Sequence, residues 1–206
     1  MGTDTGLLTK TILKKDENKM LIYDCEIIKC IPTGVRLDNY KYCDGWRDFE
    51  NMGVSVIGYD TGDTLDYITD PITRFQEIVD SEKDIVGFNS KSFDDFLLKS
   101  HGIEIETTYD LLEEIRLTAF GSSDYRDTPK GFSYSLDAIS KANNCQKTGR
   151  GDLAPQLWQD GKTQEVINYC LNDVKITKLI LELGLEGKLI DPNTGEFLQL
   201  RPMELK

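Results

Sequence analysis

Apolar and β-branched residues dominate positions 21–30, as is typical of a central, buried β-strand. Asp24 and Glu26 interrupt this apolar run near its middle. Because side chains alternate along a strand, the two carboxylates point to the same face, about 7 Å apart at Cα. Two like charges beside a core are costly unless a partner such as a divalent cation compensates them. Asp24 and Glu26 are therefore predicted metal ligands.

The same Asp-x-Glu pattern recurs at residues 48–50 and 80–82. Neither copy lies inside an apolar run, and both have the surroundings of a solvated loop or helix end. The apolar context, rather than the tripeptide itself, singles out the first pair.

The hydrophobic pattern after this strand predicts an antiparallel meander, followed by alternating strands and helices. The alternation implies parallel pairing, and hence a mixed sheet flanked by helices. The expected strands after the first lie at 54–58, 64–69, 84–88 and 103–109, with a turn at 59–63. One expected helix begins at Pro71, and a second follows Ser92 as its cap. Three more are expected at 111–120 after Asp110, at 135–143, and at 164–185 with Thr163 as the cap.

The two ends of the chain differ from this alternating core of about residues 20–185. Residues 1–19 have the polarity of a loose leader or an edge strand, and residues 188–200 have the pattern of a terminal β-hairpin. A long polar connection at 31–51 follows the first strand. The length of 206 residues predicts a single domain over residues 1–206.

Composition narrows the classes of function. The net charge of −12 argues against broad, non-specific binding to nucleic acid, but leaves room for a narrow site where metal ions supply positive charge. Five cysteines without a Cys-x-x-Cys pair, and a single histidine, make a zinc site a poor fit. We expect free thiols, a cytoplasmic (intracellular) location and no association with a membrane.

A second candidate carboxylate lies where the strand at 84–88 turns into a helix that begins with Asp94 and Asp95. Acidic residues in the first turn of a helix also interact favourably with its dipole, so this feature alone leaves a structural role equally open. Asn89 can tie the backbone of the connecting loop.

A third candidate pair lies on the long helix, where Tyr169 and Asp173 are four residues apart and share a face. That face also carries Val166, Cys170 and Thr177, so it is expected to point inward. An inward aspartate needs a partner. A half-buried core tyrosine remains an equal alternative for Tyr169.

These motifs, taken in order, resemble those of the DEDD 3′–5′ exonucleases of the ribonuclease H-like superfamily. An acidic pair on the first strand, Phe93-Asp94 at a helix start and Tyr-x-x-x-Asp on the last long helix carry the resemblance. The tyrosine-type (DEDDy) variant fits, because Asn168 stands where the other variant needs histidine. The likeness covers about residues 20–185, and is greatest to the proofreading domains of family B DNA polymerases.

The resemblance implies a ribonuclease H-like fold with a five-stranded sheet and a two-metal exonuclease. Two Mg²⁺ or Mn²⁺ ions would be held by all-oxygen ligands and would stabilise the attacking and leaving oxygens of an in-line displacement. Tyr169 would orient the water, and the products would be nucleoside 5′-monophosphates. The implied ligands are Asp24, Glu26, Asp94 and Asp173.

The resemblance also implies the partners: the 3′ end of a single-stranded nucleic acid, with DNA favoured over RNA, and a replication or repair protein. Ile27 departs from the family, which usually has Thr or Ser there to touch the terminal nucleotide. The expected substrate contacts are Ile27, Asn89, Phe93, Lys147 and Arg150, whereas for the two basic residues ordinary surface charge is the stronger alternative. A non-catalytic module that binds nucleic acid or protein on the same fold is the alternative function.

Overall fold

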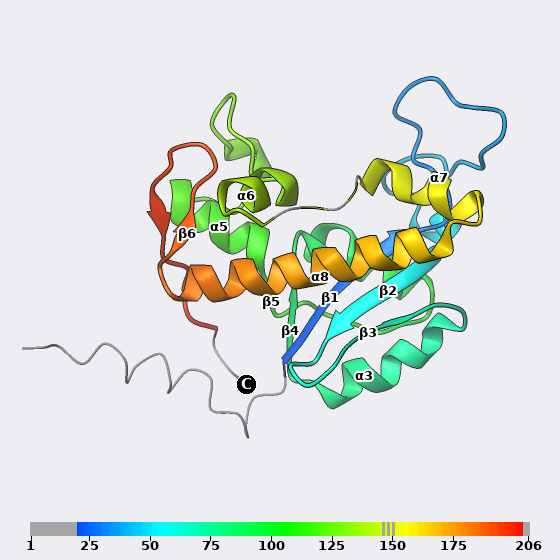
Figure 1. Cartoon of the computed structure of the whole chain (residues 1–206), viewed down its shortest axis with the longest axis horizontal. Coiled ribbons are helices and arrows are strands. Elements are labelled where there is room, and N and C mark those ends of the chain that lie inside the picture. Colours follow the sequence, from blue (N-terminus) through cyan, green and yellow to red (C-terminus); the bar gives the residue numbers. More distant parts are fainter. Residues whose placement is uncertain (1–19, 146, 148, 150, 204–206) are drawn as a thin grey trace, which may run out of the picture.

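The computed structural model describes residues 20–145, 147, 149 and 151–203. The expected leader at 1–19 and the expected contact residue Arg150 lie outside the described residues. A mixed five-stranded sheet forms the centre, in the order β3-β2-β1-β4-β5, with β1 in the middle (Figure 1). Its strands are β1 (Met20–Ile27), β2 (Val54–Asp60), β3 (Leu65–Ile68), β4 (Asp84–Gly87) and β5 (Tyr109–Asp110).

The pairing follows the expected meander and crossover pattern. β2 pairs antiparallel with both β1 and β3, whereas β4 runs parallel to β1 and β5 parallel to β4. The central position of the strand that carries Asp24 and Glu26 is therefore confirmed. A register irregularity between Glu26 and Ile27 ends the regular part of the β1–β2 ladder.

Helices cover both faces of this sheet. The α-helices are α2 (Phe49–Met52), α3 (Phe75–Ser81), α4 (Asp94–Ser100), α5 (Leu111–Phe120), α6 (Leu136–Ala142), α7 (Ala154–Gln159) and α8 (Thr163–Leu185). Short 3₁₀ turns lie at Ile72–Arg74, Ser90–Ser92, Tyr125–Asp127 and Gly151–Leu153. Among the described helices, none combines the length and the apolar content needed to cross a membrane.

Alternation along β1 separates two hydrophobic clusters. Tyr23, Cys25 and Ile27 pack with buried side chains of α3 and α4 on one face. Ile22 packs on the other face in a cluster with side chains of α5, α6 and α8. Because Asp24 and Glu26 share the parity of Ile22, they belong to the face that α8 crosses in Figure 1.

Gly58 allows α8 to lie very close to the sheet. It pairs with Asp24 across the β1–β2 ladder. A Cβ atom at Gly58 would lie 2.9 Å from Sγ of Cys170 and 3.3 Å from a methyl group of Val174, both on α8. The Cys170 thiol also lies 3.4 Å from the main-chain oxygen of Asp24, to which it donates a hydrogen bond. The long helix is thereby fixed directly above the acidic part of β1.

The C-terminal hairpin is confirmed. β6 (Leu189–Ile190) and β7 (Phe197–Leu198) pair antiparallel after α8 ends. Leu200 then donates a main-chain hydrogen bond to Gly184 near the end of α8. The hairpin is thus attached to the far end of the helix from α7, as Figure 1 shows.

Several expected details are wrong. The expected strand at 103–109 reduces to the two residues of β5, although Ile103 and Ile105 are buried in the core. Burial therefore produced the apolar pattern there without continuous strand pairing.

The expected helix starts also shift. Phe93, and not Ser92, precedes α4, and no side chain caps that helix. Thr163 is the first residue of α8 rather than its cap, and Pro71 precedes a 3₁₀ turn rather than opening an α-helix. Asp110 is the cap expected for α5, and its side chain accepts hydrogen bonds from the amides of Leu112 and Glu113.

The close approach at Gly58 generates a test. Gly58→Ala should lower the free energy of unfolding by about 1–3 kcal/mol, because overpacking forces strained side chains. Cys170→Ala removes the clashing sulfur, so it should recover a large part of that loss in the double variant. Gly34→Ala, where nothing lies within 4 Å of the added Cβ, is the matched control. Chemical denaturation of wild type, the two single variants at Gly58 and Cys170 and their double variant measures the coupling, and additive losses would contradict it.

Candidate active site

The two β1 carboxylates lie beneath α8. Glu26 is 7% exposed, whereas Asp24 is half-buried. The intervening Cys25 side chain packs into the opposite cluster. Strand alternation has thus placed two acids together on a face that is otherwise apolar, as the sequence predicted.

Asp94 and Asp95 begin α4, and both are buried. The Asp95 carboxylate belongs to a core network: it accepts hydrogen bonds from the Tyr23 hydroxyl, from the Thr107 amide at 3.0 Å and from the Thr107 hydroxyl at 2.8 Å. Burial is the largest cause that raises the pKa values of Asp24 and Glu26, and the nearby charge of Asp94 raises both further. The two neighbouring aspartates therefore have different roles, one structural and one in the candidate site.

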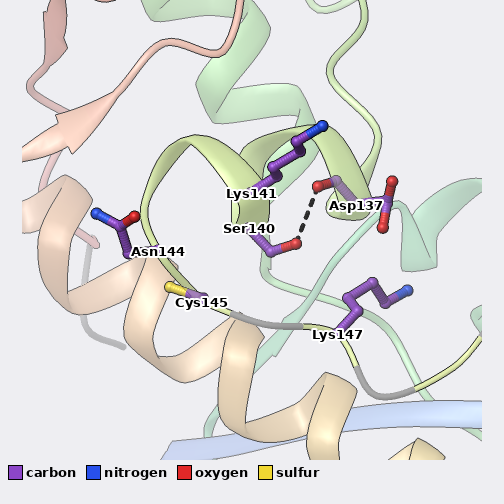
Figure 2. A pocket seen from close by; sticks show the side chains of 6 residues that line it. All are labelled: Asp137, Ser140, Lys141, Asn144, Cys145 and Lys147. Atoms are coloured by element: carbon purple, nitrogen blue, oxygen red, sulfur yellow. Dashed lines mark hydrogen bonds between the residues drawn. The ribbon is translucent and has the colours of Figure 1, made fainter.

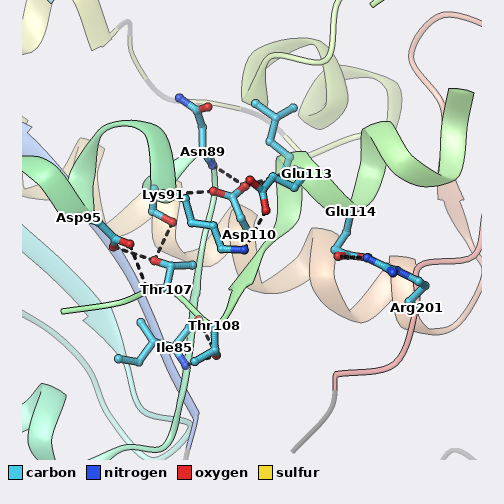
Figure 3. Close-up of polar contacts among 12 residues, drawn as sticks. Ile85, Asn89, Lys91, Asp95, Thr107, Thr108, Asp110, Glu113, Glu114 and Arg201 are labelled. Atoms are coloured by element: carbon cyan, nitrogen blue, oxygen red, sulfur yellow. Dashed lines mark hydrogen bonds and ion pairs between the residues drawn. The ribbon is translucent and has the colours of Figure 1, made fainter. Parts of the chain in front are cut away.

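The loop before α4 is held by Asp110. Its carboxylate accepts hydrogen bonds from the main-chain amides of Asn89 at 3.0 Å and of Lys91 at 3.1 Å (Figure 3). Asn89 has a left-handed backbone with φ of 63°, a conformation that asparagine tolerates better than most residues. Asn89 therefore shapes the turn that leads to Asp94, as expected, while its contact with a substrate stays a prediction.

Tyr169 and Asp173 are buried on the inward face of α8, with 6% and 4% of their surfaces exposed. The ammonium group of Lys147 lies beside both. Its Nζ is 2.7 Å from Oδ2 of Asp173, donates to the Tyr169 hydroxyl at 3.0 Å, and lies 5.1 Å from the centre of the Tyr169 ring. Lys147 is thus a cation inside the candidate site and not an ordinary surface charge.

Glycines bring the Lys147 segment against Tyr169. A Cβ atom at Gly149 would lie 2.7 Å from a ring carbon of Tyr169, and one at Gly151 would lie 3.2 Å from its hydroxyl oxygen. A Cβ atom at Gly149 would overlap the ring, whereas one at Gly151 would fit only if Tyr169 moved by a few tenths of an ångström. The ion pair of Lys147 with Asp173 was missed by the sequence analysis, and the alternating glycines at 149 and 151 were the available signal.

Burial and mutual repulsion dominate the electrostatics of the acidic groups. Burial raises the pKa values of Asp24 and Glu26 well above their ordinary range, and neighbouring carboxylates, including Asp173 and Asp94, raise them further. Burial is also the largest cause that raises the pKa of Asp94 to about 7. The positive charge of Lys147 lowers the pKa values of Asp24 and Glu26 and so offsets part of this repulsion.

Tyr169 is held in its neutral form. Burial raises the pKa of its hydroxyl far above the ordinary value, and the charge of Asp173 raises it further. At neutral pH this hydroxyl can donate and accept hydrogen bonds but cannot act as a phenolate base. The expected role as an orienting group remains chemically consistent with this environment.

The acidic groups were tested for their fit to divalent cations. Among the described residues, no group of three or more His, Cys, Asp or Glu side chains has a metal-holding arrangement, and Lys147 supplies local positive charge. However, Oδ1 of Asp173 is buried and has no hydrogen-bond partner among the described residues. A buried oxygen left without a partner carries a large desolvation cost. Together with an all-oxygen donor set, this oxygen fits Mg²⁺ or Mn²⁺ better than a softer metal.

The other expected substrate contacts differ in their surroundings. Ile27 is 7% exposed and packs in the core cluster opposite the acids, so its contact with a terminal nucleotide stays a prediction. Phe93 is half-buried and packs against the rings of Trp46 and Phe49. Of the two basic residues, Lys147 lies in the site, and Arg150 is outside the described residues.

A pocket of about 430 Å³ lies beside the site, between α6 and the Lys147 segment (Figure 2). Its lining residues are Asp137, Ser140, Lys141, Asn144, Cys145 and Lys147. Burial is the largest cause that raises the pKa of Asp173, and the charge of Asp137 on α6 raises it further. The pocket therefore borders the acidic site.

Comparisons with known proteins identify the fold. No protein-family model matches the sequence, and no curated protein matches it. The structure is similar to part of the family B DNA polymerase from the hyperthermophilic archaeon Pyrobaculum calidifontis, with a TM-score of 0.57 and 16% sequence identity. The likeness covers 88% of this chain and 26% of the polymerase chain, so this chain spans about a quarter of that protein. The expected ribonuclease H-like fold is thereby confirmed.

The raised pKa of Asp94 predicts that, without metal, the free energy of unfolding decreases as the pH rises. The protonated acid is favoured in the folded state, so its contribution is complete below the ordinary pKa of 3.8 and is lost as pH rises through about 7. In EDTA, the melting temperature should fall by at least about 4 °C between pH 5 and pH 8. Asp94→Asn should flatten this fall, whereas Asp44→Asn, at an exposed position, should not. If the melting temperatures of wild type and both variants fell equally between pH 5 and pH 8, Asp94 would not be the group responsible.

Proposed function

We propose that this protein is a metal-dependent 3′–5′ exonuclease that hydrolyses single-stranded nucleic acid to nucleoside 5′-monophosphates. The supporting observation is that acids from three separate elements, β1, α4 and α8, lie close enough for the charges on α4 and α8 to add to burial in raising the pKa values of the β1 acids, while one buried oxygen of Asp173 has no hydrogen-bond partner within the part of the chain that the structure describes. Such a cluster is expensive to bury unless it binds cations. The likeness of the fold to part of a DNA polymerase favours DNA as the polymer.

In this proposal Asp24, Glu26, Asp94 and Asp173 hold two Mg²⁺ or Mn²⁺ ions. When bound, such a pair of ions activates water and stabilises the leaving oxygen of an in-line displacement. The neutral Tyr169 hydroxyl orients the attacking water through a hydrogen bond. Lys147, which pairs with Asp173 in the absence of metal, is released and contacts the backbone phosphate of the substrate.

A second candidate function is a non-catalytic module that binds nucleic acid or protein. The observation in its favour is Lys147 itself, because an internal ammonium group partly neutralises the acids without any metal ion. The two functions differ in one outcome. An exonuclease exchanges the ammonium for metal ions, whereas a binding module retains it.

Cleavage of a single-stranded oligonucleotide tests the proposal directly. With a 5′ label, Mn²⁺ should produce a ladder of products shortened from the 3′ end, and EDTA should abolish it. The double variant Asp24→Asn, Glu26→Gln is the control for a contaminating nuclease. Intact oligonucleotide after prolonged incubation with Mn²⁺ or Mg²⁺ would refute catalysis, and running DNA and RNA in parallel measures the preference.

Metal binding should depend on Lys147 in a specific direction. Lys147→Met removes the charge but keeps an unbranched side chain, so the apo protein should melt at a lower temperature at pH 8. Millimolar Mn²⁺ should raise the melting temperature of wild type by several degrees through selective binding to the folded state. The increase should be larger in Lys147→Met, since no ammonium competes for Asp173. Lys141→Met, at an exposed position on α6, is the control, and a smaller increase in Lys147→Met would contradict the exchange.

The two residues on α8 should separate metal binding from chemistry. Tyr169→Phe keeps the ring and all the acids, so it should slow single-turnover cleavage by about 10²–10⁴-fold while stabilisation by Mn²⁺ persists. Asp173→Asn should lose both cleavage and stabilisation by Mn²⁺. Tyr134→Phe removes another buried hydroxyl, which donates to Asp191 at 3.1 Å, and should leave the rate unchanged. A Tyr169→Phe protein that cleaves at the wild-type rate would assign this tyrosine to the core alone.

A further inference from the structure

Four aromatic side chains form a connected group beside the candidate active site. Trp46 meets Phe93 edge-on with 6.2 Å between ring centres, and Phe49 meets Phe93 edge-on at 5.6 Å. Phe49 also stacks on Phe96 at 5.6 Å with only 16° between the ring planes. We call Trp46, Phe49, Phe93 and Phe96 the aromatic platform.

The platform is only partly buried. Trp46 is 63% exposed and Phe96 is 53% exposed, while the two inner rings, Phe49 and Phe93, are half-buried. The inner rings pack against the core cluster formed by β1, α3 and α4. The outer rings thus present large apolar faces to solvent on a support that the core holds in place.

Two different parts of the chain build the platform. Phe93 and Phe96 flank the start of α4, so Phe93 directly precedes the proposed ligand Asp94. Trp46 and Phe49 come from the end of the long connection at 31–51, for which the sequence suggested no role. The platform therefore adjoins the proposed ligand Asp94 through Phe93, its neighbour in the chain.

The connection is attached at a second point, away from the platform. The Lys41 amide donates to the Gln159 side chain at 2.7 Å, and the Tyr40 hydroxyl donates to Asp160 at 3.1 Å, both at the end of α7. Figure 1 shows the connection rising next to α7 on the side of the molecule opposite the C-terminal hairpin. The connection is thus held at α7 by these hydrogen bonds and at α4 by the rings of Trp46 and Phe49.

The charges around Trp46 are mixed, because Arg47 is exposed and so are the acids Asp44 and Glu50. The carboxylate of Asp48 accepts hydrogen bonds from the Asp44 amide and from the Asn51 side chain, each at 2.7 Å, and these bonds lower its pKa. Any ligand of the exposed rings is therefore held by the rings themselves and not by a basic surface.

We propose that the aromatic platform binds the bases of a single-stranded nucleic acid by stacking, next to the end that enters the acidic site. The proposal rests on the proposed function. Aromatic side chains that stack on successive bases are a general solution for binding single strands without sequence preference, and they work on an acidic protein because stacking does not depend on net charge. Trp46, as the largest exposed ring, contributes most.

Binding to a labelled sixteen-nucleotide single strand in EDTA, measured by fluorescence anisotropy, separates stacking from cleavage. Trp46→Ala should weaken binding by about 5- to 150-fold, the range expected from the loss of one base–aromatic stack, and Trp46→Phe should lose less. An abasic strand of the same length and charge should bind wild type and Trp46→Ala equally. Because Trp46 is exposed, circular dichroism should show all the variants folded.

Two control variants sharpen this test. Val35 and Leu37 are 92% and 50% exposed in the same connection, so Val35→Ser, Leu37→Ser removes apolar surface without touching the platform. Phe197→Ala removes an aromatic ring that is 69% exposed on the C-terminal hairpin. Both should bind the oligonucleotide as tightly as wild type does.

The outcomes distinguish this proposal from the proposed function. Equal affinity of wild type and Trp46→Ala for the normal strand, or no binding by wild type, would overturn the platform and assign its surface to another partner such as a protein. If binding depends on Trp46 and on the bases but wild type never cleaves with Mn²⁺, the platform holds and the exonuclease fails. If wild type cleaves with Mn²⁺ but Trp46→Ala binds the strand as tightly as wild type does, the exonuclease proposal holds and the aromatic platform fails.

Discussion

The close contact between α8 and the sheet at Gly58 is the constraint on which the candidate site depends. A side chain at this position would meet Cys170 at 2.9 Å, and the same cysteine hydrogen-bonds to the main chain of Asp24. The helix therefore lies closer to β1 and β2 than any residue larger than glycine at position 58 would allow without a shift. Tyr169 lies one residue before this contact and Asp173 three residues after it, so the spacing of one helix determines how both approach the strand.

Charge compensation is the second organising feature. Buried acids on β1, α4 and α8 repel each other, and among the described residues the ammonium group of Lys147 compensates part of this charge. Gly149 and Gly151 lie against Tyr169, and Nζ of Lys147 lies 2.7 Å from Asp173. The compensation is partial, since the pKa values of Asp24 and Glu26 stay raised well above their ordinary range despite Lys147. A site in this state has a strong electrostatic preference for additional positive charge.

The sequence was informative where one local rule decided the structure. Alternation along β1 placed Asp24 and Glu26 on one face, and a four-residue spacing placed Tyr169 and Asp173 together, because these periods are properties of the backbone. The predicted strand at 103–109 was wrong, because burial of side chains produced an apolar pattern there without pairing to a neighbouring strand. The sequence analysis also missed the partner of Lys147 and the packing of Trp46 on Phe93, because both depend on how loops from distant parts of the chain meet. The likeness to part of a polymerase confirms the fold, whereas the roles of the site residues remain predictions.

The different surroundings of Asp94 and Asp95 have a consequence for comparing this chain with distant relatives. Asp95 is bound by Tyr23 and Thr107 inside the core, whereas the charge of Asp94 acts on the acids of β1. A pairwise alignment that slips by a single position at this helix would exchange a structural acid for a candidate ligand without any drop in apparent similarity. Homologues are therefore better matched by the tyrosine and threonine that accompany the buried acid than by the acidic pair itself.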